Sequence, residues 1–186
     1  MLFIAFYNSV LNASASPEDM PFPVSKMHFK KGAVFTRYGQ IESAVYFMNS
    51  GIVEMNIKSY MTEKVIDFFF ENEMFSAFTS FLNQLPTDVQ ISALTDCEVE
   101  VISHADLMEA YADSFEVNKF GRILTEHAYI RKSNREKDLL TKTAEERYAE
   151  MFQTKAEYIS NIPVNKIAKY LGIHPESLSR IRKKIT

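Results

Sequence analysis

The spacing of hydrophobic residues changes twice along this chain and divides it into three regions. A short apolar segment at residues 2–12 is long enough for one helix. From residue 27 to residue 103, apolar and polar positions alternate, which is the period of half-buried β-strands. From His104 onward, apolar residues recur at steps of three and four, which is the period of helices. The alternating region predicts strands at residues 45–48, 52–57, 65–70 and 97–102.

Glycines and one helical interruption define the strand region further. Gly32, Gly39 and Gly51 lie between the alternating runs, where turns are expected. Short strands separated in this way are typical of an antiparallel sandwich or barrel. The alternation breaks within residues 72–82, where apolar residues follow helical spacing at Phe75, Phe78, Phe81 and Leu82. We therefore expect an antiparallel sandwich or barrel with a short helix inserted between two of its strands.

The helical region begins with a long segment at residues 114–138. Its apolar residues alternate between steps of three and four, which forms a short heptad-like seam at Val117, Phe120, Leu124 and His127. Such a seam is suited to pairing with a second copy of the chain. The alternative is that these residues pack on their own barrel. A charged, Ser/Thr-bearing hinge is expected at residues 131–143, followed by another helix at residues 144–158.

The last part of the chain predicts two short helices joined by a tight turn. Val164, Ile167, Ala168 and Leu171 fall on one face of the first helix. Gly172 follows at the position where a left-handed helix stop favours a residue without Cβ. Pro175 suits the first turn of the next helix, because the backbone N–H that it lacks has no intrahelical partner there.

The second helix of this pair has an apolar face and a polar, mostly basic face. The apolar stripe is Leu178, Ile181 and Ile185. The opposite face collects Glu176, Ser179, Arg180 and Lys183, flanked by Ser177 and Lys184. This is the layout of a helix-turn-helix whose second helix enters the DNA major groove. The alternative is a solvated amphipathic helix pair.

Charge is distributed in agreement with a DNA-binding end. The whole chain has a net charge of −3. Residues 163–186 carry six Lys or Arg residues against the single acid Glu176, a net of +5, and the rest carries fifteen against twenty-three acids, a net of −8. Because an acidic body repels phosphate, contact with DNA is expected only at the basic end.

The residue types present exclude several chemistries. The single Cys97 excludes a disulfide scaffold and an iron–sulfur cluster built from this chain. Haem would need an axial ligand such as His28, His104 or His127, but lone histidines are mostly structural or exposed. Neither a nucleophile elbow, a P-loop, HExxH nor a Rossmann fingerprint occurs, and the strands carry almost no His for a metal enzyme of the jelly-roll type. We therefore expect no cofactor, no metal and no enzymatic activity.

No apolar stretch reaches the roughly 18–20 residues that a membrane-spanning helix needs. The N-terminal apolar stretch is short and lacks the positive segment of a signal peptide. We expect a cytoplasmic protein that does not bind membranes.

The order of barrel, inserted helix, long helix and helix-turn-helix resembles the Crp/Fnr family of bacterial transcription regulators. The strongest similarity lies in residues 167–173 and 176–180. In this family a Glu and an Arg four residues later contact base edges, which implies this role for Glu176 and Arg180. Arg can bond bidentately to guanine, and Glu can accept from cytosine N4. The expected DNA-binding set is Glu176, Ser177, Ser179, Arg180, Lys183 and Lys184.

The resemblance also implies a cyclic nucleotide-binding domain in the barrel, but the phosphate-binding residues do not match. Members that bind cyclic AMP place Gly-Glu at the start of the inserted helix and an Arg shortly after. Here Ser76 and Ala77 fall in the Gly-Glu positions and Thr87 in the Arg position. Loss of the Arg bond alone costs roughly 2–5 kcal/mol. We therefore expect neither cyclic AMP nor cyclic GMP to bind. The pocket, at Phe75, Ser76, Ala77, Thr87 and Asp88, is expected to hold another ligand or to be filled by aromatic side chains.

These inferences combine into an α+β chain. Residues 1–113 form a sensor barrel of double-stranded β-helix type, residues 114–138 a dimerisation helix and residues 139–186 a helix-turn-helix domain. The expected function is that of a homodimeric, sequence-specific transcription regulator that binds an inverted repeat in double-stranded DNA and does not respond to cyclic AMP. RNA polymerase and an unidentified small-molecule effector are further candidate partners. The alternative is a ligand- or protein-binding sensor whose helix-turn-helix no longer works on DNA.

Overall fold

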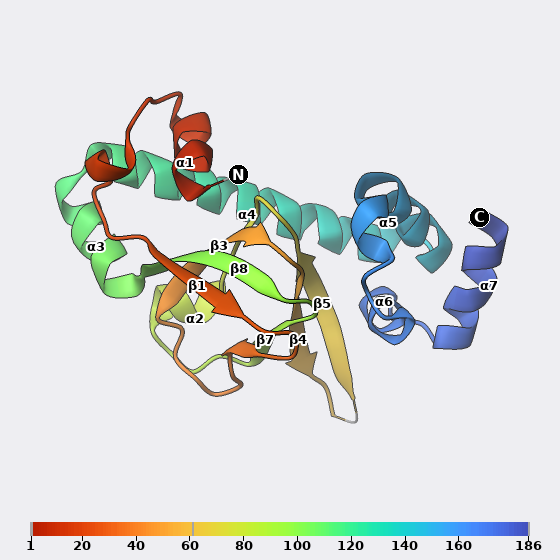
Figure 1. The fold of residues 1–186 in the computed structure, drawn as a ribbon. Helices are drawn as coiled ribbons and strands as arrows, with labels where there is room; N and C mark the ends of the chain where they lie inside the picture. The colour runs from red at the N-terminus through yellow and green to blue at the C-terminus, as the bar shows by residue number, and fades with distance from the viewer. Residues whose placement is uncertain (1, 61, 186) are drawn as a thin grey trace.

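The computed structural model describes residues 2–60 and 62–185. A β-roll forms the body of the molecule, one long helix runs along it, and the last helices pack at one end (Figure 1). The first sheet has the strand order β1 (Ser25–Phe29), β8 (Cys97–Ser103), β3 (Ala44–Ser50), β6 (Met74–Phe75). The second has the order β2 (Val34–Thr36), β7 (Val89–Ala93), β4 (Val53–Lys58), β5 (Glu63–Phe69).

All of these strand pairs are antiparallel, which confirms the expected jelly-roll-like class. The predicted strands correspond to β3, β4, β5 and β8 within two residues at each end. The other four strands were missed: β2 and β6 are short and β1 lacks an apolar face, whereas the alternation of Val89, Ile91 and Ala93 in β7 was overlooked. In β1, for example, four of the five residues are exposed, so no apolar face marks it in the sequence.

The inserted helix is shorter than its sequence pattern predicts. Residues 74 and 75 pair with Phe47 and Tyr46 as strand β6, and α2 begins only at Phe78 (Phe78–Asn83). The prediction of a helix from residue 72 was therefore wrong. Strand pairing lets the Phe75 ring stack on Tyr46 inside the roll, with 5.1 Å between ring centroids, and this contact outweighs the helical spacing of the phenylalanines.

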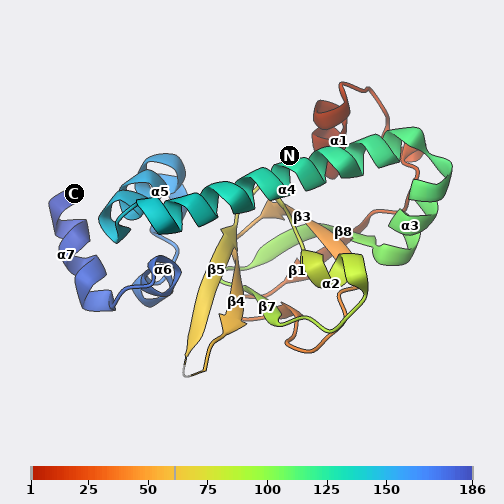
Figure 2. The same ribbon diagram turned by 180° about the vertical axis from the view of Figure 1, so that it is seen from behind.

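The N-terminal helix and the start of the long helix cover the outside of the first sheet. Helix α1 (Phe3–Leu11) lies beside α4 (Phe115–Thr141), and α3 (His104–Asp113) leads into α4 (Figures 1 and 2). Phe3 is almost fully buried, and its ring lies 5.8 Å from that of Phe47 and 5.9 Å from that of Phe120. A short 3-10 helix, η1 (Pro17–Asp19), links α1 to the first strand.

Helix α4 continues through most of the expected hinge. Residues 131–141 are helical, so the chain leaves helical geometry only around Lys142 and Thr143. The Thr143 side chain and Glu146 then form a capping box that starts α5 (Ala144–Ile159). An ion pair between Lys142 and Asp138 supports the last turn of α4. The expected hinge over residues 131–143 is therefore corrected to a break of two residues.

The C-terminal helices share a hydrophobic core with the barrel. Helices α5, α6 (Val164–Leu171) and α7 (Pro175–Ile185) bury a cluster that includes Tyr148, Ile167, Leu171 and Leu178. The same cluster contains residues from the second sheet and its turns: Ile52, Val65, Phe68, Phe70 and Leu94. The helix-turn-helix is therefore docked on the barrel. Within the described part of the chain, none of the helices has the length and apolarity that crossing a membrane requires.

Candidate nucleic-acid interface

The turn between α6 and α7 is built by one left-handed residue and two backbone carbonyls. Gly172 adopts φ +73°, and a Cβ there would meet nothing within 4 Å, so the backbone angle rather than space favours glycine. The N–H groups of Gly172 and Ile173 both donate to the carbonyl of Ala168. The carbonyl of His174 accepts from the N–H groups of Ser177 and Leu178, at 3.0 and 3.2 Å, and starts α7. The expected helix-turn-helix backbone is confirmed.

The inward faces of both helices agree with the predicted stripes. Ile167, Ala168 and Leu171 are at most 2% exposed, and Leu178 is fully buried. The two other predicted members of the second stripe are half-buried: Ile181 and Ile185. Because α7 is anchored by this stripe, its opposite face has a fixed orientation.

The outward face of α7 carries the six predicted DNA-binding residues, and all six are exposed: Glu176, Ser177, Ser179, Arg180, Lys183 and Lys184. Lys184 pairs with Glu145 of α5 at 3.0 Å, and the Ser179 hydroxyl donates to the Pro175 carbonyl at 3.0 Å. No ion pair involves Glu176, Arg180 or Lys183 within residues 2–60 and 62–185. Helix α7 lies at the end of the molecule that points away from the barrel (Figure 1). These side chains can therefore reach a groove without obstruction by the barrel.

Two other basic residues of the helix-turn-helix turn inward. Lys166 on α6 pairs with the buried carboxylate of Glu54 at 2.5 Å, and Lys169 lies 3.8 Å from Glu63. Both acids belong to the second sheet. The positive charge counted for this end of the chain is thus partly neutralised by the barrel, which the sequence count could not show.

The predicted pocket residues are mostly buried and bonded to the chain itself. The Ser76 hydroxyl donates to the Ala44 carbonyl at 2.9 Å, and the Thr87 hydroxyl accepts from the Val89 N–H at 3.1 Å. Phe75, Ser76, Ala77 and Thr87 are at most 8% exposed, whereas Asp88 is exposed. Four of the five expected residues are therefore buried in the barrel, and the two hydroxyls among them are bonded within the chain.

Aromatic rings fill the space beside these residues. Tyr46 and Phe75 stack, and Phe35 meets Phe75 edge-on with 5.3 Å between centroids. Phe29 stacks on Phe35 at 4.0 Å, and Phe69 lies 5.7 Å from Phe75. This arrangement resembles the aromatic filling that was one of the two expectations for the pocket.

A fully buried carboxylate, Glu42, lies at the start of α2. It accepts hydrogen bonds from the Thr36 hydroxyl at 2.5 Å and from the N–H groups of Ser43 and Ala77 at 3.0 and 3.3 Å. A buried charge needs such donors to offset its lost hydration. The amide of Ala77, the residue expected at the Glu position of the Gly-Glu pair, is thus already bonded to an anion of the chain. Sequence reasoning missed Glu42, because it lies in a polar turn without a motif.

The predicted seam of α4 is buried in its first half and exposed at its end. Val117 and Phe120 are at most 2% exposed and belong to the core formed with α1 and the first sheet. Leu124 is half-buried beside that core, and His127 is exposed. The first half of the seam therefore packs on its own barrel, which was the alternative interpretation. The helix instead exposes Ile130, at 54%, on a neighbouring face.

Among the described residues, no group of three His, Cys, Asp or Glu side chains is arranged to hold a metal ion. Cys97 is buried in the barrel core, where burial raises the pKa of its thiol.

Comparisons with known proteins agree with this architecture. Residues 26–114 match the family model of the cyclic nucleotide-binding domain. No curated protein sequence matches the chain. Among solved structures, FixK2 from Bradyrhizobium japonicum is 17% identical, with a TM-score of 0.73 over 88% of this chain and 84% of that one.

Two further solved structures are similar to the chain at comparable identity and coverage. A regulator of the Crp/Fnr family from Eubacterium rectale is 18% identical, with a TM-score of 0.75 over 96% of this chain and 86% of that one. The c-di-GMP-responsive global regulator CLP of Xanthomonas campestris is 17% identical, with a TM-score of 0.68 over 87% and 86%. Identities this low establish the fold rather than the activity. Residues 26–114 are thus similar to a cyclic nucleotide-binding domain, and the chain as a whole shares the fold of solved Crp/Fnr transcriptional regulators.

Proposed function

We propose that this protein is a sequence-specific DNA-binding transcription regulator that binds an inverted repeat as a homodimer. The observation that carries the proposal is the outward face of α7, where exposed Glu176, Arg180 and Lys183 stand on a helix anchored by a buried stripe. The similarity to Crp/Fnr regulators supports it, and those neighbours are regulators rather than enzymes. Such a protein would act in the cytoplasm.

The side chains on this face divide by chemistry into base and phosphate contacts. Arg180 can bond to O6 and N7 of a guanine, and Glu176, one turn earlier, can accept from the N4 amino group of a cytosine. Ser177, Lys183 and Lys184 are suited to phosphate oxygens, which fix the position of the helix without specifying sequence. The two base contacts would therefore set the half-site sequence.

The exposed face of α4 is the proposed dimer contact. Half-buried Ile123 and exposed His127, Ile130 and Asn134 follow steps of four, three and four, the spacing of a coiled-coil seam. The 27 residues of α4 extend roughly 40 Å, long enough to connect a contact along the barrel with the DNA-binding end. The two α7 helices would then lie in successive major grooves about 34 Å apart.

The barrel is proposed not to respond to cyclic AMP. An incoming cyclic phosphate would meet the Glu42 carboxylate and would compete with it for the Ala77 amide. Two anions sharing one buried set of donors repel each other strongly. The aromatic rings around Phe75 would also have to move.

Selection of bound fragments from random DNA by the purified full chain, with and without cyclic AMP, tests this function. The expected result is an enriched inverted repeat that is the same in both conditions. Enrichment only with cyclic AMP would contradict the proposed closed pocket. If neither condition enriches a sequence and Arg180→Ala leaves retention on heparin unchanged, the regulator proposal fails and the sensor alternative is favoured.

A further inference from the structure

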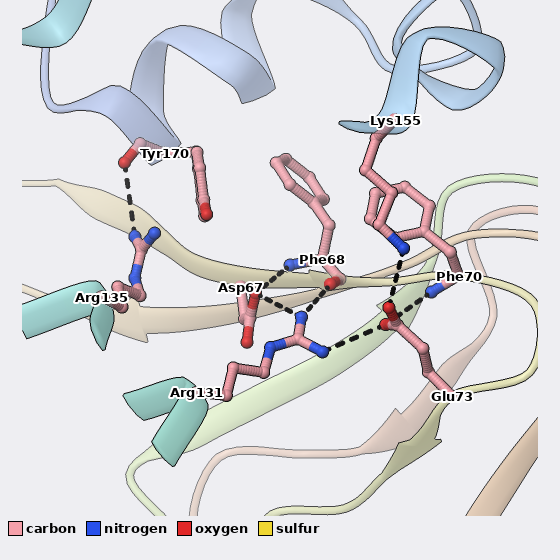
Figure 3. Close-up of polar contacts among 8 residues, drawn as sticks. All are labelled: Asp67, Phe68, Phe70, Glu73, Arg131, Arg135, Lys155 and Tyr170. Carbon is pink, nitrogen blue, oxygen red and sulfur yellow. Dashed lines mark hydrogen bonds and ion pairs between the residues drawn. The ribbon is translucent and has the colours of Figure 1, made fainter. Parts of the chain in front are cut away.

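Three structural units meet at one carboxylate, Glu73, on the turn between β5 and β6. Figure 3 shows its side chain between α4 and α5. Its Oε2 atom lies 3.2 Å from the Arg131 guanidinium of α4, and its Oε1 atom lies 2.9 Å from the Lys155 ammonium of α5. Oε2 also accepts the Phe70 N–H at 3.2 Å, which holds the carboxylate to its own turn. The barrel, the long helix and the DNA-binding domain are thus joined at a single side chain.

Arg131 extends the junction along β5. Its guanidinium donates to the Asp67 carboxylate at 3.0 Å and to the Phe68 carbonyl at 2.9 Å (Figure 3). Burial opposes its charge, but Asp67 and Glu73 outweigh burial, so the pKa of Arg131 is raised and the group stays charged. One turn further along α4, the Arg135 guanidinium lies 3.9 Å from the ring centroid of Tyr170 on α6. Helix α4 therefore contacts the barrel through Arg131 and the DNA-binding domain through Arg135, which lie one turn apart on the same face.

An irregularity in α5 coincides with the same junction. Lys155, which pairs with Glu73, has φ −136° and ψ 28° and interrupts the helix. Helix kinks usually arise at Pro or Gly or from an inserted group, yet the surrounding sequence is Gln-Thr-Lys-Ala-Glu. After the kink, the Tyr158 ring packs on Phe70 of the barrel, with 4.7 Å between centroids. The Thr154 hydroxyl also donates to the Glu150 carbonyl at 2.8 Å, a back-bond that often bends helices, so the bend and the barrel contacts coincide at Lys155.

The junction is also connected to the interior of the barrel. The backbone carbonyl of Glu73 accepts the Met48 N–H at 3.0 Å, and Glu73 directly precedes β6. Two residues later, Phe75 stacks on Tyr46, and Ala77 donates to Glu42. Both ends of this short segment are therefore fixed, so the Glu73 carboxylate has a defined position on the barrel.

We propose that Glu73 is a positioning residue for DNA recognition, which rests on the function proposed above. It touches no DNA, but it fixes the angle of the DNA-binding domain against α4 and thereby the separation of the two α7 helices in a dimer. A full inverted repeat requires that separation, whereas one half-site does not. Loss of the Glu73 contacts should thus affect the two kinds of DNA differently.

The test compares Glu73→Gln with the unmodified chain on an inverted repeat and on a single half-site. Glutamine keeps the size of the side chain but loses the charge that holds Arg131 and Lys155. The affinity for the inverted repeat should fall about tenfold, while the affinity for the half-site stays within about twofold. Lys155→Met should likewise weaken binding to the inverted repeat but not to the half-site. Lys155→Arg, which keeps the charge, should bind the inverted repeat as tightly as the unmodified chain. Glu71→Gln, the same change at an exposed position of the same turn, is the matched control and should alter neither affinity.

A DNA-independent readout separates this proposal from the proposed function. Cys97 is the sole cysteine and is buried, so spin labels on Lys31→Cys and Lys183→Cys report the distance between the barrel and α7. Glu73→Gln should broaden that distance distribution. An unchanged distribution, or equal losses for the half-site and the inverted repeat, would overturn the positioning role. If Arg180→Ala leaves both DNA affinities intact while the distances still broaden, the DNA proposal fails and the mechanical role of Glu73 stands.

Discussion

The barrel interior and the outward face of α7 differ in what holds their polar groups. In the barrel, the Ser76 hydroxyl and the Ala77 amide bond to the chain itself, and the carboxylate of Glu42 occupies several donors. On α7, the side chains of Glu176 and Arg180 face solvent. A ligand for the barrel would have to replace strong internal hydrogen bonds, whereas DNA would replace water. Under the proposed function, the same fold would keep its DNA-binding surface open and its barrel pocket closed.

Removal of Glu42 should have the largest effect, because its carboxylate accepts several of the hydrogen bonds that hold the barrel interior together. Glu42→Ala leaves the Thr36 hydroxyl and the N–H groups of Ser43 and Ala77 without their acceptor, and should lower the free energy of unfolding by about 2–4 kcal/mol. Chemical denaturation measures the loss. Glu98→Ala removes an exposed carboxylate from the adjoining sheet and should cost about 1 kcal/mol or less.

The same variant offers a sharper test. The atoms deleted in Glu42→Ala correspond to acetate, so added acetate should recover part of the lost stability in this variant and none in Glu98→Ala. Full stability of Glu42→Ala without acetate would show that the carboxylate does not hold the interior together.

The next largest effect is expected on the exposed face of α7. Arg180→Ala removes a bidentate base contact and should weaken binding to the selected site by about 1–3 kcal/mol, with relaxed specificity at one base position. Competition binding against single-base variants of the site measures both effects. Lys184→Ala should instead weaken all sequences alike, and only slightly, because Lys184 already pairs with Glu145. Equal losses on every sequence for Arg180→Ala would contradict its role as a base contact.

The helix-turn-helix could be predicted from sequence because its determinants are local. Gly172, Pro175 and the stripe ending in Leu178 lie within a few residues of one another, and periodicity and capping act over that range. Glu42 and Glu73 were not predictable in this way. Glu42 accepts from an amide 35 residues away, and Glu73 meets Lys155 across 82 residues. Only the folded barrel brings these partners together.

The seam of α4 was predicted correctly as an apolar stripe, but two of its residues pack on the same chain and not on a second copy. Val117 and Phe120 do form an apolar stripe, and it is covered by Phe3 of α1 and by the first sheet. Periodicity shows that a face is buried without showing what buries it. Asp67 offered a signal that was overlooked, since it is the single acid within the apolar run at residues 65–70 and it pairs with Arg131.

Helix α4 gives the next prediction, which compares its two faces. Ile130→Glu puts a charge into the proposed contact between copies and should weaken self-association about tenfold or more. Tyr129→Glu makes a similar change on an adjacent exposed face and should leave self-association unchanged. Val117→Ala should lower the free energy of unfolding by about 2 kcal/mol through a cavity without a specific effect on the dimer. Sedimentation analysis and denaturation separate these outcomes, and a stable dimer of Ile130→Glu would exclude this face.

The smallest effect is expected in a measurement of thiol alkylation, which leaves the barrel sequence unchanged. Cys97 lies in the barrel core, where burial raises the pKa of its thiol and keeps the reactive thiolate scarce. Its alkylation rate therefore reports how often the interior opens. In a Lys183→Cys variant, the new thiol on α7 should react faster than Cys97 by roughly two orders of magnitude, since core positions open with free energies of several kcal/mol. Cyclic AMP should change neither rate. Faster alkylation of Cys97 with the nucleotide would mean that the ligand enters and loosens the aromatic interior, whereas the rate at α7 provides the internal reference for reagent strength.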